Sequence, residues 1–287
     1  MANAFAPASG ILTLGPHSRT AGAALFRQSW LPATDARAAV VLAHGYAEHA
    51  GRYQHVAERF MGAGFAVHAV DHWGHGRSDG ERGFVSDFSV FLDGIEALLG
   101  YVQTSHPGLP IIAIGHSMGG LIAATHLLTH QHSYHAAILS GPAVSAGTPP
   151  SAATRLIGHL LSRFLPKAGL IQLDAQAVSR DSAIVSDYLA DPLVYKGKMS
   201  ARLAANMLNA MERIQSQAHE IYLPLLVVHG SKDTLASPDG GRSLVMRASS
   251  TDKHFELLEG LYHEVFNESE RDKILSSVID WIDARLP

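Results

Sequence analysis

Residues 111–128 read IIAIGHSMGGLIAATHLL, and they place a small polar serine between glycines where one apolar run stops and another begins. The first run, rich in β-branched residues, predicts a buried strand, and the second run has the apolar spacing of a helix. Ser117 is therefore expected in a sharp strand-to-helix turn. Such a turn is either an ordinary connection or a means of presenting the serine hydroxyl.

Alternating strands and helices extend outward from this stretch. Near-continuous apolar runs, typical of parallel strands buried on both faces, occupy residues 38–45, 64–72, 110–117, 135–142, 223–233 and 254–260. Amphipathic patterns typical of helices occupy residues 53–64, 88–103, 119–130 and 272–285. This order predicts an α/β fold with a mostly parallel, doubly wound sheet. Residues 10–16 and 22–30 are expected to add antiparallel strands at one edge.

The alternation breaks between residues 144 and 220, a segment too long for a simple crossover between two strands. We expect a mainly helical cap inserted here, over the carboxyl ends of the strands, with residues 1–143 and 221–287 forming the core. Within the cap, apolar residues recur at helical spacing with basic residues between them: Leu156, Ile157, Leu160, Leu161, Phe164 and Leu165, with Arg155, Arg163 and Lys167. This stripe either packs on the core or makes transient contact with a membrane surface, and the sequence leaves both open.

Composition narrows the classes of function. The chain has 287 residues, 47% hydrophobic and 17% charged, which is typical of a globular protein with a large core. A net charge of −4 and the lack of basic runs argue against nucleic acid as a partner. Cysteine is absent, which excludes disulfides and thiolate chemistry and fits a reducing compartment. Because neither a signal-peptide pattern nor a membrane-spanning run is present, we expect a cytoplasmic protein.

Ser117 has the context of a catalytic nucleophile. Residues 115–119, GHSMG, match the pattern G-x-S-x-G, in which glycines two positions before and after the serine make room for a strained turn. The helix that follows offers N–H groups, from Met118 onward, to an oxyanion. A second donor is expected from the loop after residues 38–45, where the Tyr46 N–H can point back at Ser117.

A serine nucleophile needs a base, and the base needs a carboxylate to orient it. Asp233 directly follows one predicted strand, and His263 closely follows the next. Both are therefore expected at the edge of the sheet where Ser117 lies. Their order along the chain, serine then acid then histidine, is that of the strand-turn-helix serine hydrolases.

Other acidic and histidine residues compete for these roles. Asp239 and Asp252 are rival acids, and His254 is a rival base, although it begins a strand at the opposite end of the sheet. His72 and His75 lie in a glycine-rich loop that lacks the context of a zinc site, so no metal is expected there. Serine chemistry of this kind requires no organic cofactor either.

Longer strings of the sequence resemble the monoacylglycerol lipases of the α/β-hydrolase superfamily. They are HGYAEHAGRY, DHWGHGRSDGERGFVSDF, HPGLP, GHSMGG, SDYLADPL and HGSKD, and the resemblance runs from about residue 40 to residue 287. It implies the α/β-hydrolase fold and a serine hydrolase that cleaves a small lipid ester, monoacylglycerol, to glycerol and fatty acid through an acyl-enzyme. On this likeness Ser117, Asp233 and His263 form the catalytic triad, and Tyr46 and Met118 supply the oxyanion N–H groups.

The resemblance also implies that Glu48, Arg52 and Tyr188 bind the glycerol head group. Judged from the residues alone, Glu48 and Arg52 can also be a local ion pair four positions apart, and Tyr188 a packing residue. The sequence departs from mammalian members of the family in lacking cysteines in the cap, in having Tyr46 where a smaller residue is common, and in having Phe266 where a polar residue is expected. These departures concern chain-length preference and the head-group pocket.

Other functions fit the same motifs. A lysophospholipase or a short-chain carboxylesterase would keep the triad and change the head-group pocket. A peptidase is related by analogy of fold. A non-catalytic binding protein of this fold would be expected to lose a member of the triad, whereas Ser117, Asp233 and His263 are all present.

Overall fold

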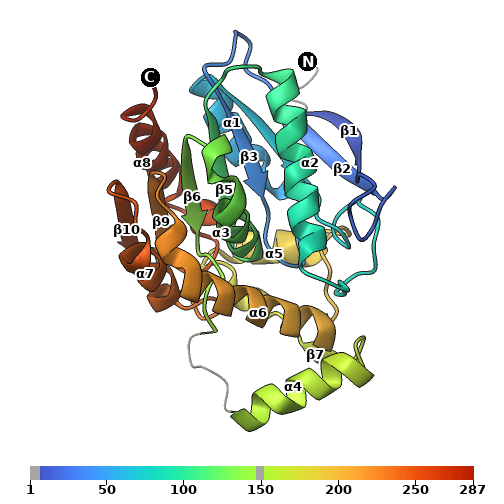
Figure 1. The fold of residues 1–287 in the computed structure, drawn as a ribbon. Coiled ribbons are helices and arrows are strands. Elements are labelled where there is room, and N and C mark those ends of the chain that lie inside the picture. The colour runs from blue at the N-terminus through green and yellow to red at the C-terminus, as the bar shows by residue number, and fades with distance from the viewer. Residues whose placement is uncertain (1–6, 147–151) are drawn as a thin grey trace.

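A mostly parallel sheet of eight strands forms the centre of the molecule (Figure 1). The structure, a computed structural model, describes residues 7–146 and 152–287, without the side chains of 152–156. The strands are β1 (Ala8–Thr13), β2 (Ala24–Trp30), β3 (Ala38–Ala43), β4 (Phe65–Val70), β5 (Ile111–His116), β6 (Ala136–Ser140), β9 (Leu225–Gly230) and β10 (Lys253–Leu258). Their order is β1-β2-β4-β3-β5-β6-β9-β10. The β1–β2 and β2–β4 pairs are antiparallel, and the other pairs are parallel.

Helices cover both faces of the sheet, because alternate residues of each strand point to opposite sides. They are α1 (Gln54–Gly62), α2 (Ser89–Ser105), α3 (Met118–His130), α7 (Pro238–Arg247) and α8 (Arg271–Asp283). In β3, Ala39 and Val41 pack into one core with α2, α3 and α7, whereas Val40 and Leu42 pack into a second core with α1 and α8. Burial on both faces explains why the central strands are continuous apolar runs.

The predicted sheet is confirmed, with two differences in detail. All six predicted parallel strands are present, and β1 and β2 form the expected antiparallel edge. However, β10 is an edge strand and is only partly buried, not buried on both faces as predicted. In addition, α7 matches no predicted helix. Gly240 and Gly241, which interrupt its apolar pattern, explain why the sequence did not indicate it.

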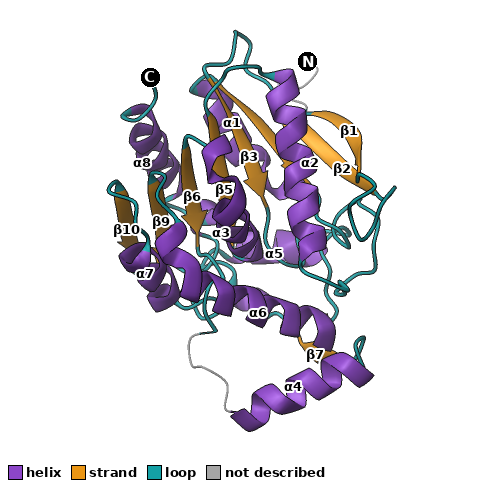
Figure 2. Ribbon diagram, in the orientation of Figure 1, coloured by secondary structure: helices purple, strands orange, loops and turns teal. Residues whose placement is uncertain are grey.

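The chain leaves the sheet after β6 and returns to it at β9. It forms α4 (Ala152–Phe164), β7 (Gly169–Ile171), α5 (Ser182–Ala190), β8 (Met199–Ser200) and α6 (Ala201–Gln217). This insertion is mainly helical, although β7 and β8 form a short antiparallel ribbon that the sequence did not predict. Helix α6 lies across the carboxyl ends of the strands, and α4 lies beyond it (Figures 1 and 2). Within the described residues, no helix is both long and apolar enough to cross a bilayer.

Candidate active site

Ser117 occupies the sharp turn between β5 and α3. Its φ of 53° and ψ of −118° form a conformation that residues with a side chain rarely adopt. A Cβ on Gly115 would lie 2.5 Å from the Gly119 carbonyl oxygen, and a Cβ on Gly119 would lie 2.1 Å from the Ala43 carbonyl oxygen. Both glycines of the motif are therefore sterically required. The Ser117 side chain makes no capping hydrogen bond to α3, so the helix does not engage its hydroxyl.

Two backbone segments adjoin Ser117, namely the start of α3 and the loop that carries Tyr46. Met118 is the first residue of α3, and the N–H groups of a first helical turn have no acceptor within the helix. The loop that carries Tyr46 lies close by, since a Cβ on Gly45 would lie 3.2 Å from the Ser117 Cβ. In the part of the chain that the structure describes, Ser117 and Ala47 of this loop are the two non-glycine residues with positive φ. Strain of this kind is held in place by the surrounding structure and often marks functional sites.

Asp233 and His263 meet just beyond the ends of β9 and β10. The His263 Nδ1 lies 2.7 Å from the Asp233 Oδ2, at hydrogen-bond distance. The other carboxylate oxygen, Oδ1, accepts hydrogen bonds from the backbone N–H groups of Leu235 (2.8 Å) and Ala236 (2.9 Å). His229 on β9 adds a contact of 3.0 Å from its Nε2 to Asp233 Oδ2. The carboxylate is thus fully engaged and fixes the orientation of the His263 ring.

Protonation of this pair follows from the same contacts. Burial by itself lowers the pKa of His263, but the hydrogen bond and negative charge of Asp233 raise it above its ordinary value of 6.5. Burial alone would raise the pKa of Asp233, yet the hydrogen bonds from His229 and His263 hold it well below its ordinary range. Asp233 is therefore ionised at neutral pH, and its charge stabilises the protonated form of His263.

Ser117, His263 and Tyr46 line the same cavity, which has a volume of about 370 Å³. Much of the remaining wall is apolar, with Met199, Met207, Leu208, Met211 and Leu235 among its residues. Flexible methionine side chains adapt to ligands of variable shape. The cavity suits an ester that carries an apolar chain.

The rival residues lie elsewhere. Asp252 pairs with Arg285, with its Oδ1 2.6 Å from the Arg285 Nη2. Asp239 lies in the first turn of α7. His254 pairs with Leu226 near the start of β10, at the end of the sheet away from Ser117. Only Asp233 and His263 of these candidates come together beside the cavity.

Glu48 and Arg52 form the predicted ion pair, within a larger buried cluster. The Arg52 Nη1 lies 2.6 Å from the Glu48 Oε2. Glu48 Oε1 also accepts hydrogen bonds from the Gly45 N–H (2.6 Å) and the Tyr53 hydroxyl (2.7 Å). The Arg52 guanidinium lies over the ring of Tyr188, 4.8 Å from its centre. The structure therefore brings all three predicted head-group residues together, with Glu48 directly behind the Gly45 backbone.

Glu264 is a member of this cluster that the sequence did not indicate. It binds Arg52 with both oxygens, at 2.7 Å to Nη1 and 2.8 Å to Nη2. Although burial alone would raise its pKa, the positive charge of Arg52 lowers it. In contrast, burial dominates at Glu48 and raises its pKa despite the same guanidinium. Glu264 follows His263 directly in the sequence, but nothing local reveals a partner 212 residues away.

His72 and His75 belong to a buried group of rings beneath the Tyr46 loop. The centre of the His44 ring lies 4.2 Å from that of His72 and 5.5 Å from that of His75. Burial lowers the pKa of His72 to about 3 and that of His75 to about 4, so both rings are neutral at pH 7. Within residues 7–146 and 152–287, no group of three or more metal-ligating side chains is arranged to hold a metal ion.

Comparison with known proteins decides the family. A family model described as serine aminopeptidase, S33, matches residues 34–270. A monoacylglycerol lipase of Mycolicibacterium smegmatis is 46% identical over 90% of this chain and 92% of its own. Human monoglyceride lipase is 34% identical over 94% of this chain and 90% of its own. The chain belongs to the monoacylglycerol lipase family.

Solved structures place this member of the monoacylglycerol lipase family in the expected fold. A monoacylglycerol lipase of Paleococcus ferrophilus, 30% identical, superposes with a TM-score of 0.81 over 91% of this chain and 99% of its own. A monoglyceride lipase variant of Saccharomyces cerevisiae, 21% identical, shares the fold with a TM-score of 0.81 over 100% of this chain and 97% of its own. The chain is thus a carboxylic ester hydrolase of the α/β-hydrolase fold, as the sequence predicted.

Proposed function

We propose that this enzyme hydrolyses monoacylglycerols to glycerol and free fatty acid, with Ser117, His263 and Asp233 as its catalytic triad. The observation that carries the proposal is the position of Ser117 and His263 on the wall of a largely apolar cavity. The charged cluster around Glu48 lies next to them, since a Cβ on Gly45 would approach both Glu48 Oε1 and Ser117 Cβ. A monoacylglycerol combines the matching parts: an apolar chain, an ester carbonyl and a polar head.

The proposed reaction has two acyl transfers. The His263 Nε2 takes the proton of the Ser117 hydroxyl while Ser117 Oγ attacks the ester carbonyl, and Asp233 stabilises the imidazolium that forms. The N–H groups of Tyr46 and Met118 stabilise the oxyanion. The C–O bond to glycerol then breaks, and the leaving oxygen takes the proton from His263. Water attacks the acyl-enzyme by the same route and restores Ser117.

Glu48, Arg52 and Tyr188 form the proposed head-group site. Their contacts support this role because a charged, fully hydrogen-bonded cluster holds its oxygen and nitrogen atoms in fixed positions. The cluster adjoins the Ser117 cavity at Gly45, and fixed polar groups beside an apolar pocket can set the orientation of a ligand. Glycerol hydroxyls both donate and accept hydrogen bonds, so they complement carboxylate oxygens and guanidinium N–H groups together.

The proposed cap, residues 144–220, brings substrate from a lipid surface. Ile157, Phe164 and Leu165, on and just after α4, are 57%, 69% and 59% exposed. Such an apolar face on a helix is typical of contact with a membrane surface. Arg155 and Leu156 of the predicted stripe have side chains outside the described residues. We therefore propose a cytoplasmic enzyme, in keeping with its lack of cysteine, that touches membranes through α4.

A substrate panel tests the proposed function. We expect turnover of monoacylglycerols to exceed that of di- and triacylglycerols, lysophosphatidylcholine, short nitrophenyl esters and an aminoacyl anilide. Ser117→Ala should lower kcat for every ester by roughly 10⁴-fold or more, because the nucleophile is lost. Ser216→Ala is the matched control, since Ser216 is an exposed serine of α6 that does not line the cavity.

Two results would contradict the proposal. Unchanged turnover in Ser117→Ala would exclude a serine mechanism at this site. Faster hydrolysis of lysophosphatidylcholine than of monoacylglycerol by the unmodified enzyme would instead assign the head-group site to a phosphodiester.

A further inference from the structure

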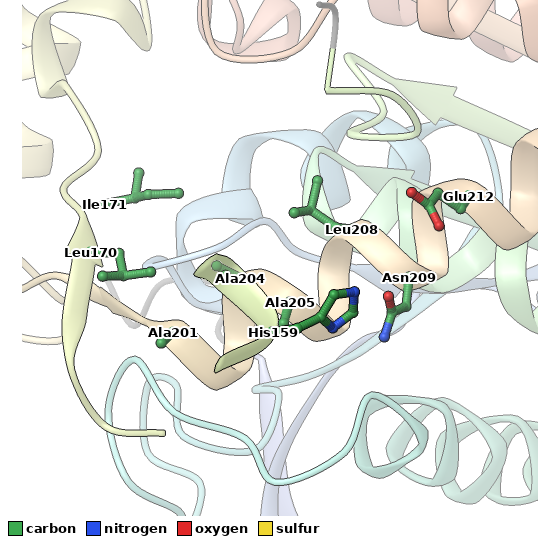
Figure 3. Close-up of a pocket in the computed structure, with 10 residues that line it drawn as sticks. His159, Leu170, Ile171, Ala201, Ala204, Ala205, Leu208, Asn209 and Glu212 are labelled. Carbon is green, nitrogen blue, oxygen red and sulfur yellow. The ribbon is translucent and has the colours of Figure 1, made fainter. Parts of the chain in front are cut away.

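A second cavity, of about 220 Å³, lies between α4 and α6 (Figure 3). Leu170 and Ile171 of β7 form one end of it, and Asn209 and Glu212 lie at the other (Figure 3). Along α6 its floor is made by Ala201, Ala204, Ala205 and Leu208. These residues share one helical face, because they follow each other at spacings of three, one and three positions. Three alanines on this face leave space that larger side chains would fill.

This cavity adjoins the cavity that holds Ser117. Ile171, Ala204 and Leu208 line both. The side chains of these three residues therefore form the boundary between the two cavities. The Ala204 side chain is small, and the Leu208 side chain is flexible. Ala205 differs from its neighbour Ala204, because it lines the α4–α6 cavity and is not among the residues around Ser117.

We propose that the α4–α6 cavity is a second compartment of the acyl-binding site, which receives the distal methylene groups of long acyl chains. The proposal rests on the proposed ester hydrolysis at Ser117. Leu170 and Ile171 are 43% and 53% exposed, so the cavity leaves apolar surface in contact with water. An acyl chain that passes the wall of Ile171, Ala204 and Leu208 covers this surface, and burial of apolar surface is favourable.

The shared wall with the Ser117 cavity and the apolar lining indicate what occupies the second cavity. The cavity is smaller than the usual pocket for a whole ligand, so it fits part of a ligand whose remainder lies in the Ser117 cavity. Its lining is apolar around Leu170, Ile171 and the alanines of α6, whereas His159, Asn209 and Glu212 supply polar groups toward the other end. Short acyl chains end inside the first cavity and do not reach the second. Ala205 is therefore a determinant of chain length.

Filling the second cavity tests this assignment. The substrates are nitrophenyl esters with acyl chains from four to sixteen carbons, presented in the same detergent micelles. For Ala205→Leu we expect kcat/KM within about twofold of the unmodified enzyme for the shortest esters and at least about tenfold lower for the longest. Ala205→Val fills less space and should give a smaller loss with the same dependence on length. Because these esters lack glycerol, the result is independent of whether monoacylglycerol is the substrate.

A matched variant and a folding measurement complete the design. Ala190→Leu adds the same atoms at an exposed alanine of α5 that lines neither cavity, and it should leave the whole series unchanged. The thermal midpoint of each variant reports folding. An unchanged profile in Ala205→Leu, or an equal loss at every chain length in both folded Ala205 variants, would overturn the proposal.

Discussion

At the scale of single residues, the buried charges next to Ser117 affect the pKa of His263. Two carboxylates, Glu48 and Glu264, share the single guanidinium of Arg52 in a buried setting. The cluster therefore carries one excess negative charge when both carboxylates are ionised. Both charges act on His263, where each raises the pKa in addition to the larger contribution of Asp233.

The Glu264→Gln variant separates these effects. The amide keeps the shape of the side chain and removes its charge. We expect the acid limb of kcat/KM to move to lower pH, because His263 must be neutral to act as a base and loses one of the charges that raise its pKa. For a monoacylglycerol, KM should also rise by about tenfold, since Arg52 loses its two-pronged partner.

The control for Glu264→Gln is Glu268→Gln. Glu268 is a buried carboxylate four residues further on, and it pairs with Arg180 rather than Arg52. Its pH profile should keep the acid limb of the unmodified enzyme. If the limb stays in place in Glu264→Gln, or moves equally in both variants, Glu264 has no specific effect on His263.

The sequence predicts a residue's role when that role depends on neighbours in the sequence, and it fails when the role depends on a contact with a distant segment. The requirement for glycine at positions 115 and 119 was predicted because the steric constraint arises within one turn, which five consecutive residues of the motif form. Asp233 and His263 were placed together because both follow parallel strands, whose carboxyl ends share an edge. The partner of Glu264 could not be predicted, because the Arg52 contact depends on how a loop after β3 meets a loop after β10.

At the scale of elements, apolar periodicity predicted the helices of the core that pack with large side chains, and it missed α7, which packs with glycines. In α7, a Cβ on Gly240 would lie 2.6 Å from the Ser145 Cβ, and a Cβ on Gly241 would lie 3.1 Å from the Val227 Cγ1. The helix thus approaches the sheet through glycines. Glycine is a poor helix former, so close packing here removed the pattern on which prediction depends.

Helix α4, in contrast to α7, exposes large apolar side chains, and we predict that they contact membranes. The Phe164→Ser/Leu165→Ser double variant removes two exposed apolar side chains. We expect its binding to phospholipid vesicles, measured by sedimentation, to weaken by at least about tenfold, because each apolar side chain contributes on the order of 1.5–3 kcal/mol on transfer from water.

A double variant that removes exposed apolar side chains from another surface controls for a general loss of hydrophobic surface. Met246 of α7 and Ile11 of β1 are 74% and 59% exposed, so Met246→Ser/Ile11→Ser removes similar area away from α4. This control should bind vesicles like the unmodified enzyme, and both variants should hydrolyse a soluble short-chain ester at the unmodified rate. Equal vesicle binding by the two double variants would exclude α4 as the contact surface.

At the scale of the whole molecule, buried neutral histidines link folding to pH. Burial lowers the pKa of His68, His72, His116 and His126 to about 3, and that of His75 to about 4. In the unfolded chain these rings titrate near 6.5. Above that pH neither state binds the protons. Below it the unfolded chain does, so the free energy of unfolding falls as pH decreases from about 6.5 toward 4. His263, with a raised pKa, acts in the opposite direction, but it is one ring against these five and against His44, His55 and His106, whose pKa values burial also lowers.

The slope of stability against pH tests this linkage. Each such histidine contributes about 1.4 kcal/mol per pH unit once the unfolded ring is fully protonated and the folded ring is not. Urea unfolding between pH 7 and pH 4.5 should therefore show a loss of stability that steepens below pH 6. His126, on α3, is a useful site for removal, because its Nδ1 lies 3.2 Å from the Tyr134 hydroxyl and it is remote from the Ser117 cavity. In His126→Gln the slope of the unfolding free energy against pH should decrease by the contribution of about one proton, and the m-value should stay unchanged. A slope equal to that of the unmodified enzyme would mean that His126 is protonated in the folded state as well.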